Sequence, residues 1–140
     1  MNSQIDVLAV DDDDITAEMV ERAMQKTPGN FRVIPACDGQ EALDILRGQS
    51  PKIIRRPYII LLDLNMPRMN GFEFLEAVRA DRSLKDSVIF IMTTSSSDHD
   101  LNRAYSEQVA GYMIKSAIGP QFVRLAVLLH DYARTVSFPA

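Results

Sequence analysis

The sequence has a single cysteine, Cys37, among its 140 residues. One cysteine excludes an internal disulfide and any metal site built from several thiolates, which fits a reducing compartment. The chain also lacks an apolar run long enough to span a membrane. Its first residues, Met1 to Asp6, have neither the basic nor the apolar segment of a signal peptide. We therefore expect a cytoplasmic protein with no membrane partner.

An excess of basic residues is also missing. The 15 Lys and Arg residues are outnumbered by 19 Asp and Glu residues, and the net charge is −4, so nucleic acid is not an expected partner. A small basic cluster of Lys52, Arg55 and Arg56 is interpreted as part of a solvated loop. A chain of this length with 46% hydrophobic residues suits one globular domain, and we expect residues 1–140 to form it.

Five short apolar stretches alternate with segments that have apolar residues at helical spacing. The stretches that predict strands are Ile5–Val10, Phe31–Ala36, Ile59–Leu62, Ser87–Met92 and Gly111–Ile114. Ile59–Leu62 is apolar at every position, which is typical of a strand buried on both faces of a parallel sheet. Strand–helix alternation repeated five times predicts an α/β fold with a doubly wound parallel sheet, strand order 2-1-3-4-5 and helices on both faces.

Several polar residues predict where the helices begin. Asp38 followed by Glu41 resembles a capping box, and Asn70 and Ser97 are further candidate N-caps. Pro120 is expected at the first position of the last helix, because proline lacks the amide hydrogen that this position leaves unpaired. The sequence therefore marks the helix starts as well as the strands.

The apolar faces of the helices differ in width. The first helix is expected to bury Ile15, Met19, Val20, Ala23 and Met24. The helix after Ser97 has a thin apolar side of Leu101, Ala104 and Tyr105. The last helix has a core face of Phe122, Leu125, Ala126, Leu129 and Ala133, and further apolar residues at Val123, Val127 and Leu128. We expect the thin helix to be the least firmly docked.

Polar side chains follow four of the five predicted strands. They are Asp11 and Asp12, Asp63, Thr93, and Lys115. Parallel strands end at one edge of the sheet, which is where open α/β sheets bind ligands. Asp63 alone could simply cap a turn, but its shared placement with the other four side chains favours a functional site.

Three crowded carboxylates require a compensating positive charge. Two unit charges about 4 Å apart interact by roughly 4 kcal/mol at an effective dielectric near 20, so either protons or a cation must offset the repulsion. Oxygen ligands without nearby His or Cys favour Mg²⁺ or Mn²⁺. Lys115 and Thr93 could then contact an anion, and Asp63 is the natural nucleophile for phosphoryl transfer.

The chain resembles a response-regulator receiver domain over nearly its whole length. The resemblance is carried in order by Val10–Asp12, Leu61–Gly71, Met92–Ser95 and Gly111–Lys115. It implies a flavodoxin-like (βα)5 fold. The connection Gln49–Pro57, the ending Lys115–Ala117 and the tail Val136–Pro139 are most similar to stand-alone receivers that partner phytochrome-type histidine kinases.

The resemblance implies a role for each matching residue. Asp63 would accept a phosphoryl group from a histidine kinase. Asp12 and Asp63 would bind Mg²⁺ directly, Asp11 would hold a metal-bound water, and the backbone carbonyl of Asn65 would be a further ligand. Such a domain is a signalling protein and not an enzyme, apart from slow loss of its own phosphate.

The resemblance also implies how a signal would leave the site. Lys115 and Thr93 would contact the phosphoryl oxygens, and Tyr112 matches the aromatic position coupled to the switch. Most receivers have a cis proline after the lysine, whereas Ser116 stands here. A cis bond before a non-proline residue costs about 3–4 kcal/mol, so we expect either a trans bond with a reshaped loop or a strained cis bond.

Two other functions remain open from the sequence. A pseudo-receiver would use the fold for binding alone, although the expected site residues are all present. A small phosphohydrolase would pass through an aspartyl phosphate, but Asn65 occupies the position two residues after Asp63 where a second acid would be expected.

The sequence after Lys115 is long enough for one helix and a tail, so we expect no output domain and a signal passed through protein contacts. The face formed by the helix after Ser97, the strand Gly111–Ile114 and the last helix is the expected output surface. The surplus apolar residues of the last helix, together with Phe138 in the tail, predict that this face also forms a homodimer.

Overall fold

The five apolar stretches form one parallel sheet with strands in the order β2-β1-β3-β4-β5, which confirms the predicted topology. The computed structural model describes residues 4–139, so residues 1–3 of the segment judged not to be a signal peptide lie outside it. The elements are β1 Ile5–Val10, α1 Asp14–Gln25, β2 Phe31–Ala36, α2 Gly39–Leu46, β3 Tyr58–Leu62, α3 Gly71–Ala80, β4 Val88–Thr93, α4 Asp98–Ser106, β5 Gly111–Ile114, two 3₁₀ turns at Lys115–Ala117 and Pro120–Phe122, and α5 Val123–Thr135.

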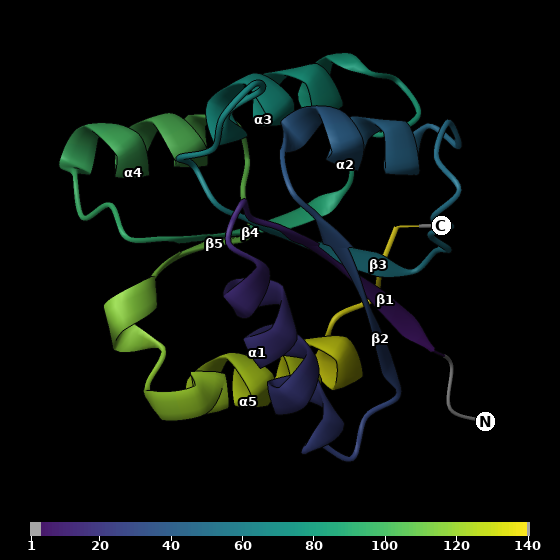
Figure 1. Ribbon diagram of the computed structural model, residues 1–140, viewed down its shortest axis with the longest axis vertical. Helices are drawn as coiled ribbons and strands as arrows, with labels where there is room; N and C mark the ends of the chain where they lie inside the picture. The colour runs from purple at the N-terminus through teal and green to yellow at the C-terminus, as the bar shows by residue number, and fades with distance from the viewer. Residues whose placement is uncertain (1–3, 140) are drawn as a thin grey trace.

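The central strand β3 shows why its sequence is apolar throughout. Helices α2, α3 and α4 cover one face of the sheet, and α1 and α5 cover the other (Figure 1). Ile60 and Leu62 pack into the cluster on the first face, and Ile59 and Leu61 pack into the cluster on the second. Each side chain of the strand is therefore buried, whichever way the pleat directs it.

The predicted helix caps are present at all three positions. The carboxylate of Asp38 accepts a hydrogen bond from the backbone N–H of Glu41 at 2.9 Å, whereas the Glu41 side chain reaches the N–H of Cys37 instead of closing the box. Asn70 forms a complete capping box with the acidic residue three positions later. The hydroxyl of Ser97 caps α4. The local sequence thus sets these helix starts by itself.

The last helix begins later than expected. Pro120–Phe122 is a 3₁₀ turn, and α5 starts at Val123. Phe122 adopts a left-handed backbone conformation with φ 57°, which interrupts the helical path while its ring is buried in the cluster of α1 and α5. The prediction of Pro120 as the first residue of a continuous α-helix is therefore wrong.

Two residues expected on buried faces are exposed instead, and Met19, Leu101 and Ala133 are half-buried. Ile15 is 63% exposed at the start of α1, and Tyr105 is 49% exposed on α4. Ala104 is the one residue of α4 that is fully buried, so the expectation of a thinly docked fourth helix agrees with the structure.

The basic cluster is largely paired within the chain. The ammonium group of Lys52 donates to the carbonyl of Pro35 at 2.8 Å and contacts Glu41 at 3.2 Å. The guanidinium of Arg56 donates to the carbonyl of Ser83 at 2.9 Å. These contacts fit the interpretation as a loop. Within residues 4–139, no helix combines the length and apolar composition needed to cross a bilayer.

The aromatic residue of the C-terminal tail packs on its own domain. Phe138 packs edge-on against Tyr132 of the same chain, with ring centroids 5.8 Å apart. Val123, Val127 and Leu128 of α5 remain exposed. The surplus apolar surface predicted for this helix is therefore present, and the half-buried Phe138 contacts Tyr132 of the same helix.

Candidate functional site

Strand register brings Asp11 and Asp63 to adjacent positions at one edge of the sheet. Val10 of β1 pairs with Leu62 of β3, so the residue after each strand is an aspartate. The backbone N–H of Asp63 donates to the carbonyl of Val10 at 3.0 Å, and that of Asp11 donates to Ala36 at 3.0 Å. The ladder thus continues one residue past each strand and fixes both aspartates.

Three carboxylates form the centre of the site. Asp11, Asp12 and Asp63 each offer an oxygen atom, and these atoms all lie within 4.8 Å of one another. Asp11 and Asp63 are buried, whereas Asp12 is exposed. The backbone N–H of Asp13 donates to Asp11 at 2.9 Å, and the Asp13 side chain caps α1. The fourth aspartate of the run, Asp14, begins that helix.

Lys115 supplies positive charge from the end of β5. Its ammonium nitrogen lies 2.7 Å from an oxygen of Asp11 and 3.6 Å from an oxygen of Asp63. Burial acts to lower the pKa of Lys115, but the hydrogen bond to Asp11 and the two carboxylate charges outweigh it and raise that pKa. The lysine therefore stays protonated beside the acids.

The buried carboxyl of Asp63 has a raised pKa. Desolvation raises its pKa above the ordinary value of 3.8, and the charge of Lys115 opposes that rise without cancelling it. The folded protein therefore holds this proton more tightly than the unfolded chain does. Ionisation of Asp63 thus lowers stability as the pH rises from about 3.8 through the raised pKa.

A stability measurement can test this titration. In EDTA, Asp63→Asn is expected to melt at a higher temperature than the unchanged protein at pH 7, because asparagine cannot ionise. The advantage should shrink as the pH falls towards 3.8. Thermal melts over this pH range measure it. An advantage of the same size at pH 4 and pH 7 would attribute the effect to packing and not to ionisation.

The carboxylate cluster fits a divalent cation. Three acids face one ammonium group at close range, so the ionised site keeps surplus negative charge. All the side-chain donors are hard oxygen atoms, and Asp12 is open to solvent, which leaves room for water ligands. Mg²⁺ and Mn²⁺ favour such donors over Zn²⁺.

Thr93 and Tyr112 lie on the side of the site towards α4. Thr93 is fully buried, and its hydroxyl is a hydrogen-bonding neighbour of Asp63. The backbone N–H of Ser95 points at that hydroxyl at 3.4 Å. Tyr112 donates its phenolic hydrogen to the carbonyl of Ser95 at 3.0 Å. The loop after β4 therefore connects Thr93 to Tyr112.

Asn65 lies in the loop between β3 and α3. Its backbone N–H approaches a carboxylate oxygen of Asp63 at 3.4 Å. Further along this loop, Arg68 reaches across to Asp38. The sequence predicts Asp38 as a helix cap and indicates no role for Arg68. A partner 30 positions away leaves no local signal by which the pair could have been found.

Of the two expected alternatives after Lys115, a trans bond with a reshaped loop or a strained cis bond, the structure has the trans bond. The Lys115–Ser116 peptide bond is trans, and Lys115–Ala117 forms a 3₁₀ turn. Arg124 of α5 donates to the carbonyl of Ala117 at 3.3 Å. The turn therefore carries the chain from the site to α5 without a cis bond at this position.

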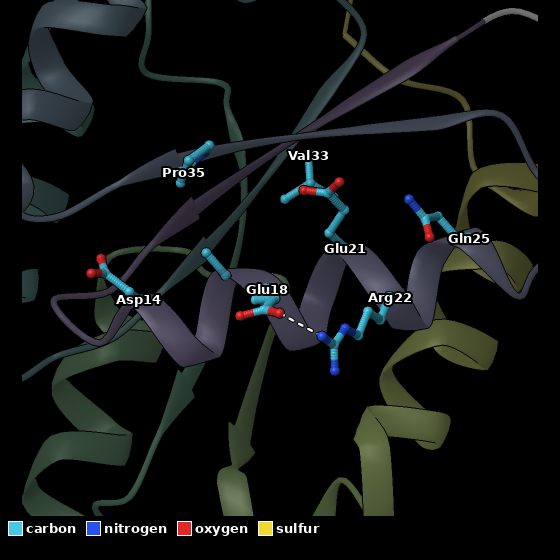
Figure 2. Close-up of a pocket in the computed structure, with 8 residues that line it drawn as sticks. Asp14, Glu18, Glu21, Arg22, Gln25, Val33 and Pro35 are labelled. Carbon is cyan, nitrogen blue, oxygen red and sulfur yellow. Dashed lines mark hydrogen bonds and ion pairs between the residues drawn. The ribbon is translucent and has the colours of Figure 1, made fainter.

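A groove of about 470 Å³ also lies between α1 and β2. Figure 2 shows the α1 side chains along it and Val33 and Pro35 of β2 on the opposite side. Glu18 and Arg22 form an ion pair of 2.6 Å, and both are more than half exposed. Such pairs contribute at most about 1 kcal/mol. The concentrated buried charge lies in the carboxylate cluster and not in this groove.

The fold and the site residues together define a receiver. The chain belongs to the response regulator receiver domain family, whose profile matches residues 7–126. Receiver domains are signalling domains that pair with histidine kinases.

Individual relatives extend over most of the chain. It is 36% identical over 109 residues to the probable methanogenesis regulatory protein FilR2 of Methanothrix harundinacea, covering 78% of this chain and 70% of that protein. It is 27% identical over 136 residues to the response regulator Rcp1 of Synechocystis sp., covering 96% of this chain and 92% of that protein.

Solved structures resemble the chain closely. The phosphorylated cyanobacterial phytochrome response regulator RcpA superposes with a TM-score of 0.88 at 26% identity, covering 99% of this chain and all of that one. The Mn²⁺-bound form of Rcp1 has a TM-score of 0.85 at 28% identity, covering 96% of this chain and 99% of that one. A related receiver thus binds a divalent metal of the kind that the carboxylate cluster suits.

Proposed function

We propose that this receiver accepts a phosphoryl group on Asp63 and signals through a changed protein-interaction surface. The observation that carries the proposal is the convergence of Asp63, two further carboxylates and the Lys115 ammonium at one edge of the sheet. The phosphorylated relative RcpA supports it. A single domain over residues 1–140 would then act by contact with other proteins.

The proposed reaction is a displacement at phosphorus. An oxygen of Asp63 forms the new O–P bond, while the bond from phosphorus to the histidine nitrogen of the kinase breaks. The leaving imidazole keeps that electron pair. Lys115 and Thr93 contact the phosphoryl oxygens. Their ammonium and hydroxyl hydrogens offset negative charge in the transition state, which is the main contribution of protein groups to such transfers.

Asp11, Asp12, Asp63 and the carbonyl of Asn65 would hold the metal, for which Mg²⁺ is the proposed ion and Mn²⁺ a substitute. When bound, the cation supplies positive charge that offsets the acids and the phosphoryl group. Lys115 keeps its own charge at neutral pH because the carboxylates raise its pKa.

The signal is proposed to pass through Thr93 and Tyr112. Phosphorylation adds about −1.5 to −2 charges beside Thr93. Movement of Thr93 towards them would displace the loop whose Ser95 carbonyl accepts the Tyr112 hydroxyl. Because α4 buries little apolar surface, a small loop shift could alter the face formed by α4, β5 and α5.

Incubation with acetyl phosphate and Mg²⁺ tests the reaction. Intact mass spectrometry is expected to detect one phosphoryl group on the protein and none on Asp63→Asn. Asp44→Asn, on α2, removes a carboxylate elsewhere and should leave the adduct unchanged. No adduct on the unchanged protein would support a pseudo-receiver, and sustained turnover of an external phosphoester would support a hydrolase.

The kinase is proposed to be of the phytochrome type, and this chain is proposed to be cytoplasmic. The likeness to RcpA, a phytochrome response regulator, supports this pairing. Purified kinase carrying radiolabelled phosphohistidine should transfer its label to this chain faster than an unrelated histidine kinase does. Equal rates from both kinases would contradict the pairing.

Self-association is proposed for the α4–β5–α5 face. Val123, Val127 and Leu128 leave an apolar strip on α5 exposed, and covering it with a second copy would remove that surface from water. Val127→Glu is expected to convert a dimer into a monomer in sedimentation velocity. Ile53→Glu, at another exposed apolar residue, should leave the dimer intact. A monomeric unchanged protein at high concentration would contradict the proposal.

A further inference from the structure

The loop from Leu64 to Asn70 is fastened tightly to the strand that precedes it. The backbone N–H of Gly71 donates to the carbonyl of Leu64 at 3.0 Å. A Cβ atom at Gly71 would lie 2.3 Å from the carbonyl oxygen of Asp63. The loop therefore closes directly on the backbone of Asp63, and a displacement of the loop would be felt at Asn65 and Asp63.

The outer end of the same loop is held by the corner between β2 and α2. The backbone N–H of Gly39 donates to the carbonyl of Met69 at 3.1 Å. The guanidinium of Arg68 binds one carboxylate oxygen of Asp38 through Nε at 2.7 Å and through a second nitrogen. Two adjacent residues of the loop thus contact two adjacent residues of the corner.

Arg68 holds a backbone conformation that favours glycine. Its φ is 61°, and the left-handed region is unfavourable for a residue with a Cβ. A glycine would adopt this conformation without that cost. The side chain that glycine lacks is the one that reaches Asp38, so the ion pair offsets a local backbone penalty.

Asp38 is arranged to receive this side chain. Its carboxylate is 4% exposed, and one oxygen accepts the N–H of Glu41 while the other accepts Arg68. Burial acts to raise the pKa of Asp38, but these hydrogen bonds outweigh it and lower that pKa. Removing Arg68 would leave a buried charge without its cationic partner, which strongly disfavours the closed arrangement.

We propose that Arg68 is a positioning residue for the divalent cation, acting through its ion pair with Asp38. The pair holds the loop so that the carbonyl of Asn65 stays available beside the three carboxylates. The inference rests on the proposed function only in taking the carboxylate cluster as the metal site. Arg68 itself is not a ligand.

Direct Mn²⁺ binding tests the proposal without any phosphodonor. The electron paramagnetic resonance signal of free Mn²⁺ gives the dissociation constant of each variant. Arg68→Gly removes the ion pair and also relieves the backbone strain, and we expect it to weaken Mn²⁺ binding about tenfold, the lower end for residues that support metal ligands. Arg68→Lys keeps a cation, so its Mn²⁺ dissociation constant should lie between those of the unchanged protein and Arg68→Gly.

Two further comparisons isolate the ion pair. Asp38→Asn keeps a good helix cap but loses the charge, and the double variant Asp38→Asn/Arg68→Gly should bind Mn²⁺ no more weakly than Arg68→Gly alone. Gln108→Gly removes the same kind of left-handed strain, φ 62°, far along the chain. It should leave the Mn²⁺ affinity unchanged.

Phosphorylation kinetics add a second readout. With acetyl phosphate, Arg68→Gly should need more Mg²⁺ to reach half its maximal rate, while the rate at saturating Mg²⁺ stays the same. Wild-type Mn²⁺ affinity in Arg68→Gly, even with a lower melting temperature, would overturn the proposal. Additive weakening in the double variant would also overturn it, because Arg68 would then act independently of Asp38.

The two proposals fail in different ways. Normal Mn²⁺ binding without any phosphoryl adduct would contradict phosphorylation and leave the role of Arg68 intact. An unchanged protein that binds no Mn²⁺ would overturn the role of Arg68.

Discussion

Gly71→Ala is expected to lower the free energy of unfolding by at least about 3 kcal/mol, the upper end of overpacking costs. An added Cβ would lie 2.3 Å from the Asp63 carbonyl oxygen and 2.6 Å from the Cα of Leu64. Both atoms belong to backbone, so no side chain can rotate away, and the chain beside Asp63 must shift. Urea unfolding measures the loss, and Mn²⁺ binding should weaken in the same variant.

Gly48→Ala provides a control for this substitution. Gly48 has φ 73°, and an added Cβ would have no atom within 4 Å. The substitution therefore carries only the left-handed backbone penalty of about 1 kcal/mol. If both variants lose the same stability, the close approach of Gly71 to the Asp63 backbone is not the controlling contact.

Arg79→Met is expected to lower the free energy of unfolding by about 3 kcal/mol, because hydrogen bonds to charged groups are strong and their acceptors would be left unpaired. The guanidinium donates to the carbonyls of Lys85 and Glu107 at 2.7 Å, of Ser87 at 2.9 Å and of Gln108 at 3.1 Å. One side chain therefore joins the loop after α3 to the loop after α4. Methionine keeps its apolar stem and removes only these donors.

Arg22→Met is the matched control for Arg79. Arg22 contacts Glu18 one helical turn away, and its side chain is 71% exposed, so its loss should cost no more than about 0.5 kcal/mol. Arg79→Lys should be intermediate, because one ammonium group cannot serve four carbonyls in the fork geometry of guanidinium. Urea unfolding of the three variants measures the order. Equal losses for Arg79→Met and Arg22→Met would contradict the role of Arg79 in joining the two loops.

Local patterns predicted most of the fold because the forces behind them are local. Ile59–Leu62 identified the buried central strand, since each position is covered by a helical layer. The caps at Asp38, Asn70 and Ser97 were readable because each accepts a hydrogen bond from an N–H three positions ahead. The expectations for Pro120 and Tyr105 failed, because the left-handed turn at Phe122 and the exposure of Tyr105 depend on how these segments pack in the folded chain.

The residues that meet at the candidate site were predictable from the sequence, but the strength of their contacts was not. Asp11, Asp63 and Lys115 were expected together because each follows a parallel strand, and the register of the sheet puts them there. The strength of their interaction could not be predicted from the sequence, because the 2.7 Å contact between Lys115 and Asp11 depends on how two distant strand ends meet in the folded chain.

The sequence by itself determined the order of strands and helices, the chemistry at the strand ends and the acidic character of the pocket, since residue type and periodicity act over a few positions. Only the tertiary structure decided that Arg68 contacts Asp38 and that Arg79 joins two loops. These contacts connect residues about 30 positions apart, and their formation depends on burial and on the path of the backbone, which no local pattern encodes.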